Sequence, residues 1–174
     1  MIRSLIVAVA LLFAAPVFTA AGSQAADEAP PPELLKVLEG VWSLEEWHEG
    51  GVVMRPPEMT GRWMVRDGVV MAVRHRNGPK DFESSGDYGE YKITATEWIY
   101  GYKRNQSARG PTAETAKTTV TWNEKIPMRT FKISHEGAKV ILTPEMGGKW
   151  EFEGPFFTLF NANGTVLRKY KRVN

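Results

Sequence analysis

Hydrophobic and polar residues alternate in short runs along most of the chain after residue 40, and Gly, Pro, Asn and Asp separate the runs. A period of two residues is typical of half-buried β-strands, and turn residues between such runs indicate antiparallel hairpins. The pattern predicts strands, some of which we expect to merge, at 41–48, 51–55, 60–67, 69–76, 87–94, 96–103, 117–123, 128–135, 138–144, 148–153, 155–161 and 164–172.

Glycine marks several of the predicted turns. The clearest are Glu49-Gly50-Gly51, Asp67-Gly68, Glu136-Gly137, Met146-Gly147-Gly148 and Asn163-Gly164, where glycine accepts the positive φ of a tight hairpin. So many strands joined by hairpins favour closure, because an open sheet would leave long edges exposed. We therefore predict an all-β protein whose antiparallel meander closes into a barrel.

Two segments fall outside this alternation. Leu34, Leu35 and Leu38 are spaced as on a helix, so residues 33–38 predict a short N-terminal helix that covers one barrel end. Residues 105–116 are rich in small and polar side chains and predict a mobile loop at the rim.

Alternation also predicts which side chains face the barrel axis. On 69–76 we expect Val69, Met71, Val73 and His75 to point inward, and the even-numbered residues to point outward. The same reasoning gathers aromatic side chains inside, with a few polar groups among them. Apolar walls with few polar groups are typical of a small-molecule cavity, although a barrel of this size can also be filled by its own side chains.

The N-terminus has the layout of a secretory signal peptide. Arg3 precedes an apolar run from Leu5 to Phe18, and small residues follow up to Ala25. The run is too short to span a bilayer, so we expect cleavage after Ala25 and no stable membrane anchor afterwards. This divides the chain into a signal peptide (1–25), an acidic, proline-rich linker (26–32) and a barrel domain (33–174), and predicts a periplasmic or secreted protein.

Composition narrows the functional classes. The chain has no cysteine, so disulfides, thiol nucleophiles and lipidated cysteines are excluded. Loss of Arg3 leaves 21 basic against 20 acidic residues, a net charge of about +1, which argues against nucleic-acid binding. Asn105-Gln106-Ser107 and Asn163-Gly164-Thr165 match the glycosylation pattern, which matters only if the protein is eukaryotic.

The sequence gives little support for a catalytic or metal-binding site. The three histidines, His48, His75 and His135, stand on separate segments without metal-ligand spacing. There is no nucleophile elbow and no phosphate-binding glycine fingerprint. We therefore expect no metal and no cofactor, and we favour a binding protein over an enzyme.

Several short motifs occur in the order seen in bacterial lipocalin-like domains. They are Leu38-Glu39-Gly40-Val41-Trp42-Ser43-Leu44, Gly50-Gly51-Val52, Gly61-Arg62-Trp63, Tyr88-Gly89-Glu90-Tyr91-Lys92-Ile93 and Arg129-Thr130-Phe131-Lys132-Ile133. Gly40-x-Trp42 resembles the lipocalin Gly-x-Trp signature, and the Thr-Asp-Tyr type second motif is missing. The resemblance implies a calycin-type barrel that binds a small apolar ligand, with Arg168 or Arg172 packed over Trp42 to close one end.

These observations predict a barrel that binds or carries a small, mostly apolar molecule. The expected ligand-binding residues are His75, Tyr100, Tyr102, Trp122, Arg129 and Phe131, and the barrel-closing residues are Trp42, Arg168 and Arg172. Two alternatives stay open: an isomerase or cyclase that works inside the barrel, and an envelope interaction or inhibitor protein that uses exposed loops such as 105–116.

Overall fold

The computed structural model of the protein describes residues 29–78 and 81–173. The predicted signal peptide and residues 26–28 of the predicted linker lie outside these ranges. Within the described ranges, a single helix, α1 (Pro32–Leu38), precedes twelve strands. The strands are β1 (Gly40–Glu49), β2 (Val52–Met54), β3 (Met59–Arg66), β4 (Val69–Asn77), β5 (Phe82–Ile93), β6 (Glu97–Gly110), β7 (Lys117–Trp122), β8 (Arg129–Glu136), β9 (Lys139–Pro144), β10 (Lys149–Glu153), β11 (Phe156–Phe160) and β12 (Val166–Arg172).

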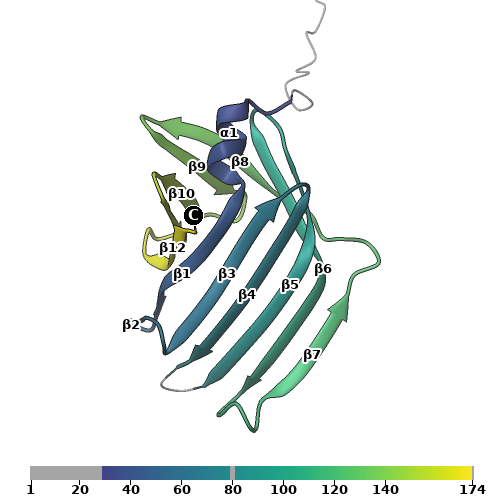
Figure 1. The fold of residues 1–174 in the computed structure, drawn as a ribbon, viewed down its shortest axis with the longest axis vertical. Helices are drawn as coiled ribbons and strands as arrows, with labels where there is room; N and C mark the ends of the chain where they lie inside the picture. The colour runs from purple at the N-terminus through teal and green to yellow at the C-terminus, as the bar shows by residue number, and fades with distance from the viewer. Residues whose placement is uncertain (1–28, 79–80, 174) are drawn as a thin grey trace, which may run out of the picture.

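The sheet closes on itself through its first and last long strands. Neighbouring strands pair antiparallel in the order β12-β11-β10-β9-β8-β6-β5-β4-β3-β1, and β12 pairs back onto β1. The result is a closed barrel of ten antiparallel strands, with β2 attached to β1 and β7 attached to β6 (Figure 1). The predicted all-β barrel with a short N-terminal helix is confirmed.

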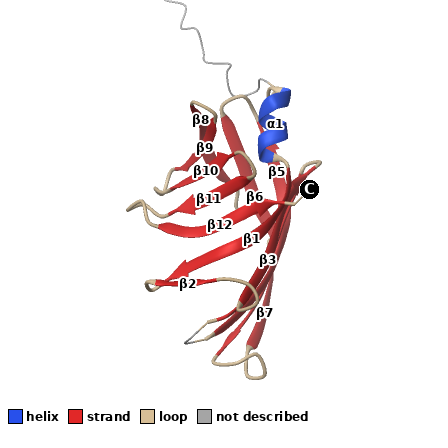
Figure 2. Ribbon diagram, turned by 60° about the vertical axis from the view of Figure 1, so that its left-hand side comes forward, coloured by secondary structure: helices blue, strands red, loops and turns tan. Residues whose placement is uncertain are grey.

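Helix α1 covers one end of the barrel, as Figures 1 and 2 show. Proline at the first helical position fits the helix start, because the missing N–H would have had no partner there. Leu34 and Leu38 point into the core and are almost fully buried. The helix therefore closes this end with apolar side chains.

The predicted hairpin chemistry is visible at the turn between β3 and β4. Asp67 and Gly68 both have positive φ, 51° and 79°, which is the conformation of a type I′ hairpin turn. This turn fixes the register in which Arg66 faces Val69 and Met59 faces Arg76.

The prediction of a mobile loop at 105–116 is wrong for its first half. Residues 105–110 continue β6, where they pair with β5 on one side, and 105–109 also pair with β7 on the other. Only 111–116 form the turn into β7. Asn, Gln and Ser in this segment break the alternation of hydrophobic and polar residues, so the sequence pattern did not predict a strand there. The strand forms because pairing with its neighbours satisfies the hydrogen-bonding groups of its backbone.

Because β5 and β6 are the longest strands, the sheet β3-β4-β5-β6-β7 reaches beyond the other half of the barrel (Figure 2). The upper part of β6 pairs with β8, from Glu97 to Tyr100, and the lower part pairs with β7, from Arg104 to Arg109. The wall on this side therefore divides, and the barrel opens at the end away from α1.

Aromatic rings fill the barrel near the α1 end. Phe157 stacks against Phe152 and Tyr170, at ring-centre distances of 4.9 and 4.5 Å, and Trp42 packs edge-on against both phenylalanines. Such contacts add about 0.5–1.5 kcal/mol per pair beyond the burial of the rings. This half of the barrel is a solid core, and any ligand space must lie on the other side of it.

The predicted facing of β4 is wrong. Val70 and Ala72 are buried, whereas Val73 is 53% exposed and Met71 is 37% exposed. Arg74 and Arg76 share the inward face with Val70 and Ala72. The odd-numbered residues were assigned to the interior because more of them are hydrophobic. The interior of this barrel instead contains arginines, whose charge is neutralised by carboxylates on neighbouring strands.

Candidate functional site

A cavity of about 380 Å³ lies inside the barrel, beyond the aromatic core. Its walls come from strands on both halves of the barrel, so only the closed fold assembles it. The lining residues are Trp63, Ala72, Arg74, Glu83, Ser85, Asp87, Tyr100, Tyr102, Asn105, Gln106, Ser107, Arg109, Arg129, Trp150, Phe157, Leu159, Arg168 and Tyr170. The volume is in the range of pockets that hold small organic molecules.

One wall of the cavity is aromatic. Trp63, Trp150 and Phe157 contact one another with ring centres 4.9–5.9 Å apart, and Tyr100 lies 5.8 Å from Trp150. These rings form a rigid surface against which an apolar molecule can pack.

Tyrosines bring hydroxyl groups to the same space. Burial raises the pKa of Tyr100, Tyr102 and Tyr170 above that of an exposed phenol. All three therefore stay neutral near pH 7 and offer hydrogen-bond donors without adding charge.

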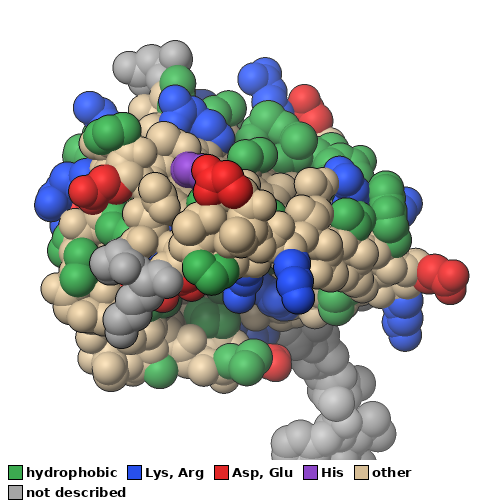
Figure 3. All heavy atoms as spheres, turned by 90° about the horizontal axis from the view of Figure 1, so that it is seen from below, with side chains coloured by type: hydrophobic (Ala, Val, Ile, Leu, Met, Phe, Trp, Pro, Cys, Tyr) green, Lys and Arg blue, Asp and Glu red, His purple; other side chains and the backbone are tan. Residues whose placement is uncertain are grey.

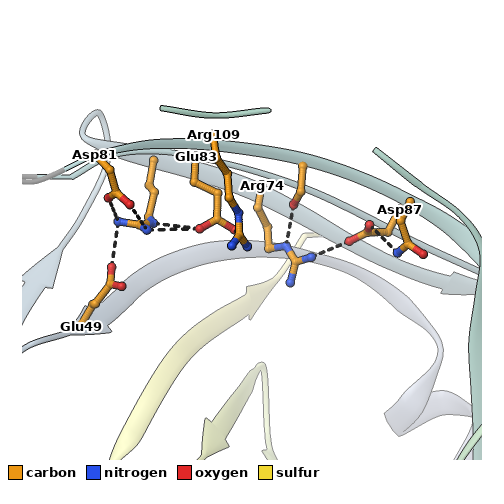
Figure 4. Close-up of polar contacts among 9 residues, drawn as sticks. Glu49, Arg74, Asp81, Glu83, Asp87 and Arg109 are labelled. Atoms are coloured by element: carbon orange, nitrogen blue, oxygen red, sulfur yellow. Dashed lines mark hydrogen bonds and ion pairs between the residues drawn. The ribbon is translucent and has the colours of Figure 1, made fainter. Parts of the chain in front are cut away.

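The opposite wall is polar and comes from β4, β5 and β6. Arg74 Nη2 lies 2.5 Å from Asp87 Oδ2, and Asn105 donates a hydrogen bond of 2.9 Å to the other oxygen of Asp87 (Figure 4). Arg74 also donates from Nε to the hydroxyl of Ser85. The charge of Asp87 is therefore compensated, and both of its oxygens are occupied.

Arg168 of β12 lines the cavity without such compensation. Its guanidinium lies 4.1 Å from the ring centre of Trp47, and its Nε is buried without a hydrogen-bond partner. Among residues 29–78 and 81–173, no carboxylate lies within ion-pair distance of Arg168. Burial lowers the pKa of Arg168, although an arginine stays protonated near pH 7. The structure thus holds a cation at the cavity with free hydrogen-bonding capacity.

A second hollow of about 660 Å³ forms the mouth of the cavity, and the two share Glu83, Arg109 and Arg168. Figure 3 looks toward the end opposite α1, where the surface is hollowed. Val52, Val53 and Leu167 contribute apolar side chains to the mouth. A molecule that enters here would pass Arg168 before it reaches the aromatic wall.

Arg76 organises one side of the mouth. Its guanidinium makes ion pairs with Glu49 (2.8 Å), Asp81 (2.9 Å) and Glu83 (3.2 Å) (Figure 4). It also lies 5.2 Å from the ring centre of Trp47. Burial tends to lower the pKa of Arg76, but the three carboxylates together raise it. The network joins the β1–β2 hairpin to β4 and β5.

The structure brings some of the expected ligand-binding residues to the cavity. Tyr100, Tyr102 and Arg129 line it, and Phe131 packs behind them against Trp150 at 4.8 Å. Arg129 is exposed at the rim, with its guanidinium 5.9 Å from the ring centre of Tyr100.

His75 and Trp122 lie elsewhere. His75 is on the outward face of β4 against Phe82, and Trp122 is 64% exposed on β7, with Arg104 over its ring. Neither residue lines the cavity, so placing them in its wall was wrong.

The sequence reasoning also missed residues that line the cavity. Arg74, Ser85 and Asp87 were absent from the expected set: Arg74 was assigned to the outer face of its strand, and Ser85 fell outside the predicted strands. The available signal was the cross-strand register: Arg74 pairs with Ser85, and Ala72 pairs with Asp87, so opposite charges lie on one face of neighbouring strands.

Two of the three expected closing residues meet at the α1 end, where Arg172 lies over Trp42 with 4.1 Å between the guanidinium carbon and the ring centre. Arg172 also donates hydrogen bonds to the carbonyl oxygens of Lys36, Val37 and Glu39. A Cβ at Gly40 would lie only 2.4 Å from Arg172 Nη1, which explains why glycine stands two residues before the tryptophan. Arg168 instead stacks on Trp47.

In 29–78 and 81–173 there is no group of three or more His, Cys, Asp or Glu side chains arranged to hold a metal ion. Within the same ranges, no helix has the length and apolar character needed to cross a membrane.

Comparison of the chain with models of protein families, with curated proteins and with solved structures finds no match.

Proposed function

We propose that the protein is a periplasmic or secreted lipocalin-like barrel that binds or carries a small, mostly apolar molecule bearing an anionic group. The observation behind this proposal is the position of Arg168: a guanidinium with an unpartnered Nε lies at the junction of the cavity and its mouth. A carboxylate, sulfonate or phosphate there would receive charge-assisted hydrogen bonds.

The aromatic wall supports an apolar body for the same molecule. Trp63, Trp150 and Phe157 offer ring faces to the cavity, and burial of apolar surface against them contributes about 25 cal/mol per Å². The anionic group would then lie toward the mouth and the apolar part toward the core.

The lining charges favour an anion over a cation. Arg74, Arg109, Arg129 and Arg168 carry four positive charges, and Glu83 and Asp87 carry two negative charges, so the lining has a net charge of +2. Glu83 and Asp87 are already engaged by arginines. A cationic ligand would find no free carboxylate in this lining.

Titration of the purified protein with fatty carboxylates, and with alcohols of the same carbon skeleton, tests the proposal. Trp63 and Trp150 line the cavity, so quenching of tryptophan fluorescence reports occupancy. We expect saturable quenching, with the carboxylate binding about tenfold more tightly than the alcohol, as one charge-assisted hydrogen bond implies. Native mass spectrometry of the same mixtures gives the stoichiometry.

Neighbouring residues of β4 supply a matched pair of variants. Ala72→Phe places a ring in the cavity and should abolish quenching, whereas Val73→Phe adds the same bulk to the outer face and should leave it unchanged. Equal binding by both variants, or no saturable binding by the unmodified protein, would refute a ligand site in the barrel.

An enzyme that acts inside the barrel is the second candidate, because Asp87 places a buried carboxylate in the cavity. Its two oxygens already contact Arg74 and Asn105, so proton transfer would require one of these contacts to open. Mass spectrometry of a bound compound before and after incubation distinguishes the candidates. A carrier returns the compound unaltered, whereas turnover that disappears in Asp87→Asn would identify an enzyme.

A further inference from the structure

Strand β7 has one edge without a neighbour. It pairs with β6 along its whole length, and in the described part of the chain no strand pairs with its other side. All six of its residues are exposed. In Figure 1 it forms the outer border of the sheet at the lower right.

One hydrogen bond fixes which residues present their backbone to this edge. The N–H of Asn123 donates to the carbonyl of Lys103 on β6, at 2.8 Å. Residues of an antiparallel strand point their N–H and C=O groups alternately to one side and the other. Thr118, Val120 and Trp122 therefore direct theirs away from β6, toward the free edge.

This edge lacks the features that usually prevent pairing with another strand. Residues 117–122 read Lys-Thr-Thr-Val-Thr-Trp, which is rich in residues of high β propensity. Natural edge strands are commonly protected by central lysines, prolines or bulges. Here the single charge, Lys117, lies at the end of the strand, and the middle is uncharged.

An exposed row of side chains leads to the same edge. Met71, Tyr88, Arg104 and Trp122 are successive cross-strand partners from β4 to β7 on the outer face of the sheet. Trp122, the last of them, is 64% exposed. A surface that continued the sheet past β7 would cover part of this ring.

We propose that β7 pairs antiparallel with β7 of a second copy of this chain, about a two-fold axis at Val120. Thr118 and Trp122 each lie two residues from Val120, so Thr118 of one copy would pair with Trp122 of the other. Every N–H and C=O group that these three residues direct to the edge would then be bonded. This inference does not depend on a ligand in the barrel.

Charge favours the antiparallel arrangement over a parallel one. With Val120 on the axis, Lys117 faces Asn123 of the partner subunit and lies next to Glu124 of the partner subunit. A parallel pair would instead bring the two lysines together, which is unfavourable. The edge is thus complementary to itself in one orientation.

Single cysteines test this register directly, because the natural chain has none. In a dimer of Val120→Cys, the cysteines of the two copies would face each other as a hydrogen-bonded pair. The Cα atoms of such a pair are about 5.5 Å apart, which is within disulfide range. We expect Val120→Cys to form a disulfide dimer at least about ten times faster than Thr118→Cys or Trp122→Cys alone. A mixture of the last two should cross-link with each other.

A proline at the same position provides a second test. The N–H of Val120 points away from β6, so Val120→Pro removes no bond within the chain but blocks pairing at the edge. Light scattering after size exclusion should show a dimer for the unmodified protein and a monomer for Val120→Pro, with unchanged circular dichroism. Equal cross-linking rates for the three cysteine variants, or a monomeric unmodified protein, would overturn the proposal.

Discussion

Arg172, near the end of the last strand, lies 4.1 Å from the ring centre of Trp42 and donates hydrogen bonds to three carbonyl groups at the end of α1. The carbonyls at a helix C-terminus lack partners within the helix. One side chain thus joins the helix, β1 and β12 at the closed end of the barrel.

Replacing Arg172 by methionine should destabilise the fold. The apolar stem is kept, but three carbonyl groups lose a charged donor and Trp42 loses its cation, so we expect a loss of about 2–3 kcal/mol. Urea unfolding followed by tryptophan fluorescence measures it. Arg66→Met is the control, because Arg66 is exposed and its nearest ion-pair distance is 3.6 Å; it should change the free energy of unfolding by less than about 0.5 kcal/mol.

Gly89 should not tolerate alanine, whereas Gly86 on the same strand should. A Cβ at Gly89 would lie 1.9 Å from the carbonyl oxygen of Gly101, but a Cβ at Gly86 meets no atom within 4 Å. Because the contact at Gly89 is with backbone, β5 and β6 would have to separate at their bulge. We expect Gly89→Ala to cost about 2 kcal/mol or more, and Gly86→Ala to be neutral or stabilising, by thermal unfolding.

The order of strands and turns was predictable because each depends on neighbouring residues. The turn at Asp67 and Gly68 needs positive φ at both positions, and the dipeptide Asp-Gly is enough to predict it. All twelve predicted strands exist, and their ends differ most at β5 and β6. There polar residues alternate with one another, so a rule based on hydrophobicity has no signal.

The facing of β4 was not predictable by counting apolar residues. Arg74 is stable inside only because Asp87 lies on the next strand, and that depends on register and closure, not on β4 alone. The residues of the candidate site were only partly predictable for the same reason. Its aromatic members follow from strand parity, whereas its charged members become apparent only when neighbouring strands are aligned.

Acid should weaken the fold through Glu46. A hydrogen bond from His48, with further contacts to Arg55 and Lys169, lowers the pKa of Glu46 from 4.5 to about 2. Because the pKa is lower in the folded state, this stabilisation is fully present above pH 4.5 and is lost as the pH falls toward 2. The stability difference between the unmodified protein and Glu46→Gln should therefore shrink over that range in urea titrations. A difference that is constant from pH 7 to pH 2 would contradict the assignment, and Glu45→Gln is the control.

The pairing of Arg74 with Asp87 should appear as strong coupling in a double-mutant cycle. Asp87→Asn leaves the guanidinium of Arg74 without its anion, and Arg74→Met leaves a carboxylate that is 6% exposed without its cation. Each single change should cost about 3 kcal/mol, and the double variant clearly less than their sum, with a coupling of about 1–3 kcal/mol. Urea unfolding at pH 7 measures all four proteins. Additive losses would mean that the two charges are solvated independently, and the cavity would then be wetter and more open than its hydrogen bonds imply.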